Sequence, residues 1–204
     1  MTLIPFYGRS WESNSYLLVG ERHAVLIDAG VNATDVLNAL ASHGAELRYI
    51  LLTHGHFDHT VSVDLLRKQT GAKLVIHTED AEMLADAQKS ALALFFGTHD
   101  THTPEDLTVQ EGDTIPFEDR QIRVIHTPGH SKGSVCYLLD HMLFSGDTLF
   151  DGGYGRYDLH GGDGDVLFRS LRRLRTEDPS LTLYPGHGGS ASLADALAKL
   201  FGTL

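Results

Sequence analysis

The chain has 204 residues, 42% hydrophobic and 21% charged, which excludes a low-complexity or disordered composition and is typical of a globular domain. Its formal net charge of −11 argues against nucleic acid or an anionic membrane as the main partner, because binding phosphate requires a basic surface. A single cysteine, Cys136, excludes an intramolecular disulfide, and no apolar run approaches the roughly 18 residues that a membrane span needs.

The first half of the chain alternates between short apolar runs and helical spacing. The predicted strands are residues 3–7, 16–19, 24–28, 49–53 and 73–77. The predicted helices are 33–43 and 58–70, with one or two more over 79–96, followed by a polar loop at 97–106. The N-terminal segment has no basic region followed by a long apolar one, so we expect no signal peptide and, by default, a cytoplasmic protein.

The second half repeats this alternation. Its predicted strands are 114–117, 121–126, 134–139, 142–145 and 181–184, with a glycine-rich loop at 150–164 and helices at 166–176 and 192–201. No Ser/Pro-rich linker separates the sets at about 1–100 and 101–204, so residues 1–204 are predicted to form a single domain of two similar halves. Such a pattern fits a sheet-on-sheet α/β core with helices on both outer faces.

A dense group of candidate metal ligands follows the strand predicted at residues 49–53. The ligand candidates are His54, His56, Asp58 and His59, and Gly55 gives the turn between them backbone freedom. Imidazole and carboxylate are ligand types that Zn²⁺, Fe²⁺ and Mn²⁺ accept. A strand end followed by a tight turn directs such side chains into one space, so this run predicts a metal centre.

Three further candidates also follow short predicted strands, each beside a glycine or a tight turn. They are His130 in HTPGHS, Asp147 in LFSGDT and His187 in LYPGHG. Together with the run at 54–59 they supply five histidines and two aspartates, enough for two divalent ions. Zinc is the expected metal, with iron and manganese left open by the ligand types.

In this order, the segments THGHFDHT, TPGHS, SGDTLF and YPGHG resemble the metallo-β-lactamase superfamily over nearly the whole chain. The resemblance implies a four-layer αββα sandwich. By position it implies that His54, His56 and His130 bind one metal, that Asp58, His59 and His187 bind the second, and that Asp147 bridges the two. Asp58 and Asp147 are therefore the predicted catalytic residues. Asp28, in the segment LIDAG, is either a carboxylate that orients a ligand imidazole or a turn residue.

The physical chemistry of such a centre indicates hydrolysis. Two cations about 4 Å apart need an anionic bridge, and the pKa of a water bound between them falls toward neutrality, so that metal-bound hydroxide is available at pH 7. A small-molecule substrate is therefore expected, without nucleic acid or membrane as partner. The oligomeric state is not specified by the sequence.

The stretch LFDGGYGRYDLHGGD, followed by YPGHG, is similar to the glyoxalase II (hydroxyacylglutathione hydrolase) branch of the superfamily. The bridging position is Asp147 rather than the cysteine of several zinc β-lactamases, and Phe150 stands where lactonases commonly have a tyrosine. This likeness implies hydrolysis of a thioester such as a hydroxyacylglutathione. Because the chain ends soon after His187, it resembles the short single-domain members, and the thiol carrier stays open.

Other functions of the same fold remain open. One is a mononuclear-iron persulfide dioxygenase, although the intact second ligand group argues against it. Another is a lactone or other ester hydrolase, and a third is a non-catalytic metal-binding or electron-transfer module.

Four residues are candidate substrate contacts. Tyr154, Arg156 and Tyr157 lie in the glycine-rich loop, and Lys132 follows the candidate ligand His130. Arg156 either binds a substrate carboxylate or forms an ion pair with a neighbour such as Asp158. Lys132 either faces the pocket or is merely solvated.

Overall fold

Side chains along the strands alternate between two apolar environments, and this alternation defines the layers of the fold. In β2 (Ser15–Val19) every residue is buried, so both faces of the strand are covered. Leu17 packs with helix α1 (Ala33–His43) in one hydrophobic cluster. Tyr16 and Leu18 point the other way, into a cluster that holds side chains from two sheets.

The computed structural model describes residues 1–202, and within them the strands form two six-stranded sheets. The first sheet runs in chain order: β1 (Thr2–Phe6), β2, β3 (His23–Ile27), β4 (Glu46–Leu51), β5 (Lys73–His77) and β6 (Leu107–Val109). Strands β1 to β3 are antiparallel, and β3 to β6 are parallel.

The second sheet has the order β12 (Ala191–Ser192), β11 (Thr182–Pro185), β10 (Met142–Gly146), β9 (Val135–Leu139), β8 (Arg120–His126), β7 (Thr114–Phe117). Strands β10 and β11 are parallel, and β9 is antiparallel to both β8 and β10. The carboxyl ends of β8, β10 and β11 therefore lie at the same edge of this sheet.

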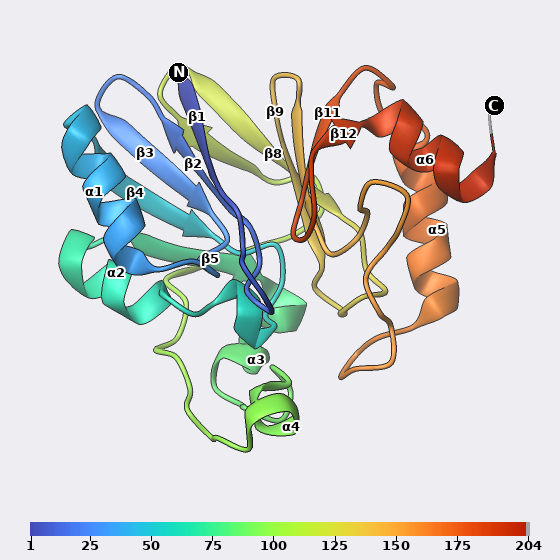
Figure 1. Cartoon of the computed structure of the whole chain (residues 1–204), viewed down its shortest axis with the longest axis horizontal. Coiled ribbons are helices and arrows are strands. Elements are labelled where there is room, and N and C mark those ends of the chain that lie inside the picture. The colour runs from blue at the N-terminus through green and yellow to red at the C-terminus, as the bar shows by residue number, and fades with distance from the viewer. Residues whose placement is uncertain (203–204) are drawn as a thin grey trace.

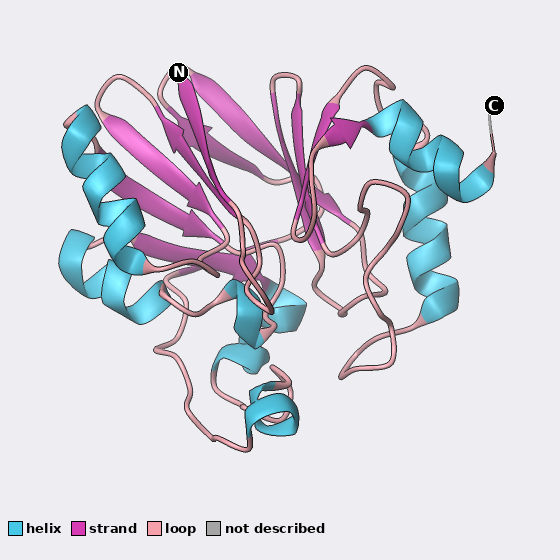
Figure 2. Ribbon diagram, in the orientation of Figure 1, coloured by secondary structure: helices cyan, strands magenta, loops and turns pink. Residues whose placement is uncertain are grey.

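Helices cover the outer face of each sheet (Figure 1, Figure 2). Helices α1 and α2 (Val63–Thr70) pack on the first sheet, and α5 (Gly164–Leu174) and α6 (Leu193–Phe201) pack on the second. Asn32 and Asp163 cap α1 and α5 by accepting hydrogen bonds from backbone N–H groups of the first turn. Two short helices, α3 (Ala81–Leu84) and α4 (Leu92–Phe96), lie beyond the lower ends of the strands in Figure 1.

This arrangement confirms the predicted four-layer αββα sandwich. The predicted helix 33–43 and the strands 73–77 and 114–117 match the observed elements at both ends. No helix among residues 1–202 has the length and apolar character needed to cross a membrane.

One predicted helix starts late: the segment 58–70 begins with a 3₁₀ turn, Phe57–His59, and α2 begins only at Val63. The segment 79–96, predicted as one or two helices, contains the two helices α3 and α4 after the 3₁₀ turn Thr78–Asp80. Ala91, directly before α4, adopts a φ of 67° that no right-handed helix allows, so α4 starts anew at Leu92. The short strands β6 and β12 were not predicted, since two or three residues carry no periodicity.

Candidate metal centre

Every candidate ligand lies in a loop that follows the carboxyl end of a strand. The run His54–His59 follows β4 of the first sheet, whereas His130, Asp147 and His187 follow β8, β10 and β11 of the second. The two sheets face each other, so these loops meet at one edge of the sandwich. Residues up to 133 positions apart in the chain are thereby brought into one site.

Three histidines form the first group of ligand atoms. His130 Nε2 lies 3.1 Å from His54 Nε2 and 2.8 Å from His56 Nδ1. All three side chains are buried. Burial, together with the neighbouring imidazoles, holds the pKa of His54 well below its usual value and lowers that of His56 to about 3. These two rings are therefore neutral and keep the lone pair that a metal ligand needs.

Asp58, His59 and His187 form the second group. His187 Nε2 lies 3.1 Å from Asp58 Oδ2, and His59 Nε2 lies 3.7 Å from the same oxygen. Asp147 stands between the groups. Its Oδ1 is 3.3 Å from His59 Nε2, and its Oδ2 is 3.7 Å from both His130 Nε2 and His187 Nε2. One carboxylate therefore reaches both sets of nitrogens.

The carboxylates of the second group and of Asp147 favour the binding of a cation. Burial alone would lower the pKa of His59, yet the carboxylates of Asp28, Asp58 and Asp147 hold it well above its usual value. Burial acts in the opposite direction on Asp58 and Asp147, but His59 and its neighbours keep the pKa of both carboxyl groups low. Within the described residues the protein thus gathers ionised carboxylates around one imidazole.

Unsatisfied polar atoms support the fit of this donor set to metal. Among residues 1–202, His56 Nε2, His59 Nε2 and Asp147 Oδ1 are buried without a hydrogen-bond partner. Leaving such atoms unpaired is costly, and a bound cation would satisfy those that face it. Five histidines and two aspartates are also donors that a pair of borderline divalent ions accepts. The residues present therefore fit a dinuclear centre.

Asp28 supports the centre from behind. Its Oδ1 accepts a hydrogen bond from the backbone N–H of Thr53 at 2.8 Å, and its second oxygen, Oδ2, accepts one from the Thr53 hydroxyl at 2.9 Å. The second oxygen lies 2.9 Å from His59 Nδ1, which leaves His59 Nε2 directed at Asp58 and Asp147. This contact is the one expected of a carboxylate that orients a ligand imidazole. The backbone of Asp28 has a φ of 56°, which is a turn conformation, so Asp28 is also a turn residue as the other alternative predicted.

Asp80 is a supporting residue that the sequence pattern did not indicate. It is buried at the start of α3 and accepts hydrogen bonds from the Ser131 hydroxyl and the Gly133 N–H, both at 2.6 Å, and from the Gly55 N–H at 3.1 Å. It thus ties the loop that carries His54 and His56 to the loop that carries His130. Only the folded structure reveals a contact between residues 51 positions apart.

Replacing Asp80 with alanine should loosen the first group of ligands. The change leaves the N–H groups of Gly55 and Gly133 buried without this acceptor, while the Ser131 hydroxyl keeps its contact with Ser134 Oγ at 2.7 Å, so we expect the free energy of unfolding to fall by about 3 kcal/mol. Metal affinity should fall by roughly 10–100-fold, as for other residues that hold ligands in place. Urea unfolding and chelator competition measure the two effects. Asp100→Ala, at an exposed aspartate in the loop before β6, is the control and should change neither.

Five of the seven candidate ligands line a cleft of about 340 Å³: His56, Asp58, His130, Asp147 and His187. Its walls are apolar side chains from the loop before β2, from the 3₁₀ turn, from α4 and from the glycine-rich loop. Arg156 lines the cleft. Its guanidinium forms two hydrogen bonds to Asp158, at 2.7 and 2.8 Å, which is the ion pair predicted as the alternative to substrate binding.

Three other predicted substrate contacts lie outside this cleft. Tyr154 packs its ring on Phe168 of α5, 5.1 Å between centroids, and belongs to the cluster beneath the second sheet. Tyr157 stacks beside Tyr154 and is otherwise exposed. Lys132 is exposed, with its stem against Gly161. Tyr154 is turned away from the cleft because its ring packs against the apolar face of α5.

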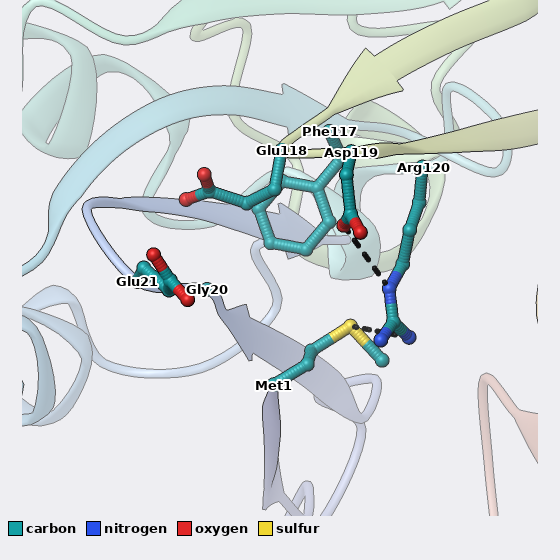
Figure 3. A pocket seen from close by; sticks show the side chains of 7 residues that line it. All are labelled: Met1, Gly20, Glu21, Phe117, Glu118, Asp119 and Arg120. Atoms are coloured by element: carbon teal, nitrogen blue, oxygen red, sulfur yellow. Dashed lines mark hydrogen bonds and ion pairs between the residues drawn. The ribbon is translucent and has the colours of Figure 1, made fainter.

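A separate hollow of about 320 Å³ lies at the other end of the strands (Figure 3). It is lined by the β2–β3 and β7–β8 turns, and β8 runs from this end, at Arg120, to the metal-site end, at His126. Three of its charged side chains already have protein partners. Glu118 accepts hydrogen bonds from the N–H groups of Arg22 and His23, and Arg120 pairs with Asp119 and Asp140. These residues therefore stabilise turns.

Comparisons with known proteins place the site in context. A family model described as the metallo-beta-lactamase superfamily matches residues 8–187. The chain is 31% identical to "Probable metallo-hydrolase MJ0888" of Methanocaldococcus jannaschii over 98% of this chain and 99% of that protein. It is 31% identical to "Probable metallo-hydrolase YqgX" of Bacillus subtilis over 87% and 85%.

Solved structures agree with the fold. The BLEG-1 B3 metallo-beta-lactamase is 30% identical with a TM-score of 0.89, and covers 95% of both chains. TTHA1623, whose structure is described as a di-iron-bound form, is 32% identical with a TM-score of 0.83, over 97% of this chain and 98% of that one.

Proposed function

Because this chain belongs to the metallo-β-lactamase superfamily, we propose that it is a metallo-hydrolase that cleaves a thioester at a dinuclear centre. The observation that carries the proposal is the convergence of two complete ligand groups on Asp147, with the second group intact in Asp58, His59 and His187. When bound, two divalent cations would lower the pKa of a coordinated water and polarise the carbonyl group of a substrate.

The residues of the cleft favour a leaving group that departs without a proton. Within residues 1–202, the titratable side chains that line the cleft are candidate ligands and Arg156, which is committed to Asp158. None of them is a spare general acid. A thiolate departs readily at neutral pH, because the pKa of a thiol is about 8.5, whereas an amine or alkoxide requires protonation. This supports a thioester over an amide or an alkyl ester.

The chain's own groups would hold and orient the reacting centre. Neutral His54 and His56 supply lone pairs, and Asp147 provides the carboxylate shared by both groups. Asp28 fixes the ring of His59 from the opposite side. The apolar side chains around the cleft exclude water, which strengthens each electrostatic interaction inside. Zinc is our proposed metal, since this donor set suits it, and the glyoxalase II-like substrate S-lactoylglutathione is the first to test.

Metal content and turnover together test the proposal. We expect about two divalent ions per chain by mass spectrometry of the purified protein, and faster hydrolysis of S-lactoylglutathione than of a lactone or a β-lactam. His187→Ala should lower both the metal content and the rate. His141→Ala, an exposed histidine on a turn, should leave both unchanged. One iron per chain with oxygen consumption on a persulfide would instead establish the dioxygenase alternative and refute the hydrolase.

A further inference from the structure

Six apolar side chains line the cleft beside the candidate ligands. This apolar wall consists of Trp11, Phe57, Phe95, Phe96, Phe150 and Leu159. Most of its rings pack against one another across segments that are distant in sequence. The Trp11 ring lies 5.6 Å from Phe57 and 5.2 Å from Phe96, and Phe57 lies 5.5 Å from Phe95. Trp11, Phe57, Phe95 and Phe96 therefore form one continuous aromatic surface, and Phe150 and Leu159 line the same cleft.

This surface is exposed although it is apolar. Trp11 is 42% exposed, Phe95 50% and Phe96 49%. Helix α4, which carries both phenylalanines, contributes no buried residue to the protein core. A helix held only at the surface, with its aromatic side chains around a cleft, is unlike ordinary core packing, and contiguous exposed apolar patches mark binding sites.

The wall is joined directly to the candidate centre. Phe57 stands between His56 and Asp58 in the chain, and the Phe150 ring lies 6.0 Å from that of His187. A group bound against the wall therefore lies next to the position of the scissile bond. The cleft volume of about 340 Å³ falls within the range of roughly 300–1,000 Å³ of small-molecule sites.

The wall offers no free cation to a substrate carboxylate. Arg156 is the cationic side chain at its rim among the described residues that line the cleft. Its guanidinium is paired with Asp158 and lies over the Phe95 ring, 5.7 Å from the centroid. The pairing neutralises the charge, and the stacking makes the arginine part of the apolar surface.

We propose that the apolar wall binds an aliphatic or aromatic group next to the scissile carbonyl, and so selects substrates with a bulky apolar substituent over small hydroxyacyl ones. The proposal rests on the hydrolase function proposed above. Each added methylene should raise kcat/KM roughly fourfold while it fits the cleft, because burial of a methylene contributes that factor.

Two substrate series locate the apolar group. One extends the acyl chain from acetyl to octanoyl on a fixed small thiol, and the other extends an alkyl thiol on a fixed acetyl group. A rise along the first series assigns the wall to the acyl side, and a rise along the second assigns it to the thiol side. A flat profile in both series overturns the proposal.

Matched variants connect the preference to the wall. In a Phe95→Ala/Phe96→Ala double variant the rise per methylene should fall toward onefold, whereas turnover of the acetyl substrate should change much less. Leu94→Ala is the control, since Leu94 lies on the same helix and is 66% exposed but does not line the cleft. An equal loss of preference in Leu94→Ala would contradict the assignment.

A binding measurement is independent of turnover. Trp11 is the single tryptophan of the chain, so its fluorescence reports directly on the wall. In the metal-loaded protein, octanoate and phenylacetate should change this signal at concentrations at least tenfold lower than lactate, and the double variant should remove the difference. If thioesters are not hydrolysed but this order of affinities holds, the hydrolase proposal fails and the apolar site stands.

A competing role for the apolar wall is burial between two copies of the chain. Measuring the oligomeric state distinguishes this role from substrate binding. The proposal expects the same sedimentation coefficient for the wild type and the double variant. A wild-type dimer that dissociates in the double variant, with the substrate preference unchanged, would overturn the proposal.

Discussion

Asp147→Ala should lower kcat/KM for a thioester by about 10³-fold and leave the protein folded. Asp147 is the carboxylate within 3.7 Å of nitrogens from both ligand groups, so its loss weakens both. Metal activation contributes several kcal/mol to such a reaction, and each 1.36 kcal/mol corresponds to a tenfold change in rate. Metal content should fall below two ions per chain, which mass spectrometry and steady-state kinetics measure on the same sample.

The appropriate control is an aspartate in the same loop. Asp151 is exposed and pairs with Lys199 of α6, 2.6 Å away, so Asp151→Ala should keep full metal content and full activity. Circular dichroism should be unchanged in both variants, because Asp147 contributes no hydrogen bond to either sheet. Full metal content in Asp147→Ala would show that the two groups are not joined through this residue.

The grouping of the candidate ligands in space was predictable from a simple geometric rule. Each of its members follows a short apolar strand, and the carboxyl ends of parallel strands lie at one edge of a sheet. The local sequence pattern of segment 58–70, in contrast, predicted the wrong start for the helix. Its apolar spacing is helical, but Asp58 and His59 are placed in a 3₁₀ turn that lies against β3, since the Ala29 N–H donates to the His59 carbonyl at 2.8 Å.

Asp80 and the cleft walls were not predictable in the same way, although Asp28 was. Asp80 acts through hydrogen bonds to loops that are remote in sequence, and nothing in its neighbourhood distinguishes it from a surface aspartate. Phe95 and Phe96 read as ordinary helix residues, yet α4 is separate from the core and presents them to the cleft. Tyr154 lies in the loop where contacts were expected but packs on α5. Loop side chains take their direction from tertiary packing rather than from local sequence.

Gly186→Ala should disrupt the second ligand group although the substitution adds one methyl group. A Cβ on Gly186 would lie 2.2 Å from Asp147 Oδ1 and 2.8 Å from His59 Cε1, closer than real Cβ contacts. Both neighbours are candidate ligands that other contacts hold in place, so a shift of either spoils the geometry of the centre. Because a displacement of about 1 Å can reduce the rate 10²-fold, we expect kcat/KM to fall by at least that factor.

The metal content should distinguish a local clash from unfolding. The three atoms nearest to the added methyl group belong to Asp147, His59 and Gly146 and not to the first group of ligands, so about one ion per chain should remain. Overpacking costs about 1–3 kcal/mol, which thermal unfolding should register as a modest loss. Gly189→Ala lies three residues further along the same loop, where a Cβ meets no atom within 4 Å, and should behave as the wild type. If Gly186→Ala kept both ions and full activity, Asp147 and His59 would have room to move, and the close packing of this loop would not be what positions them.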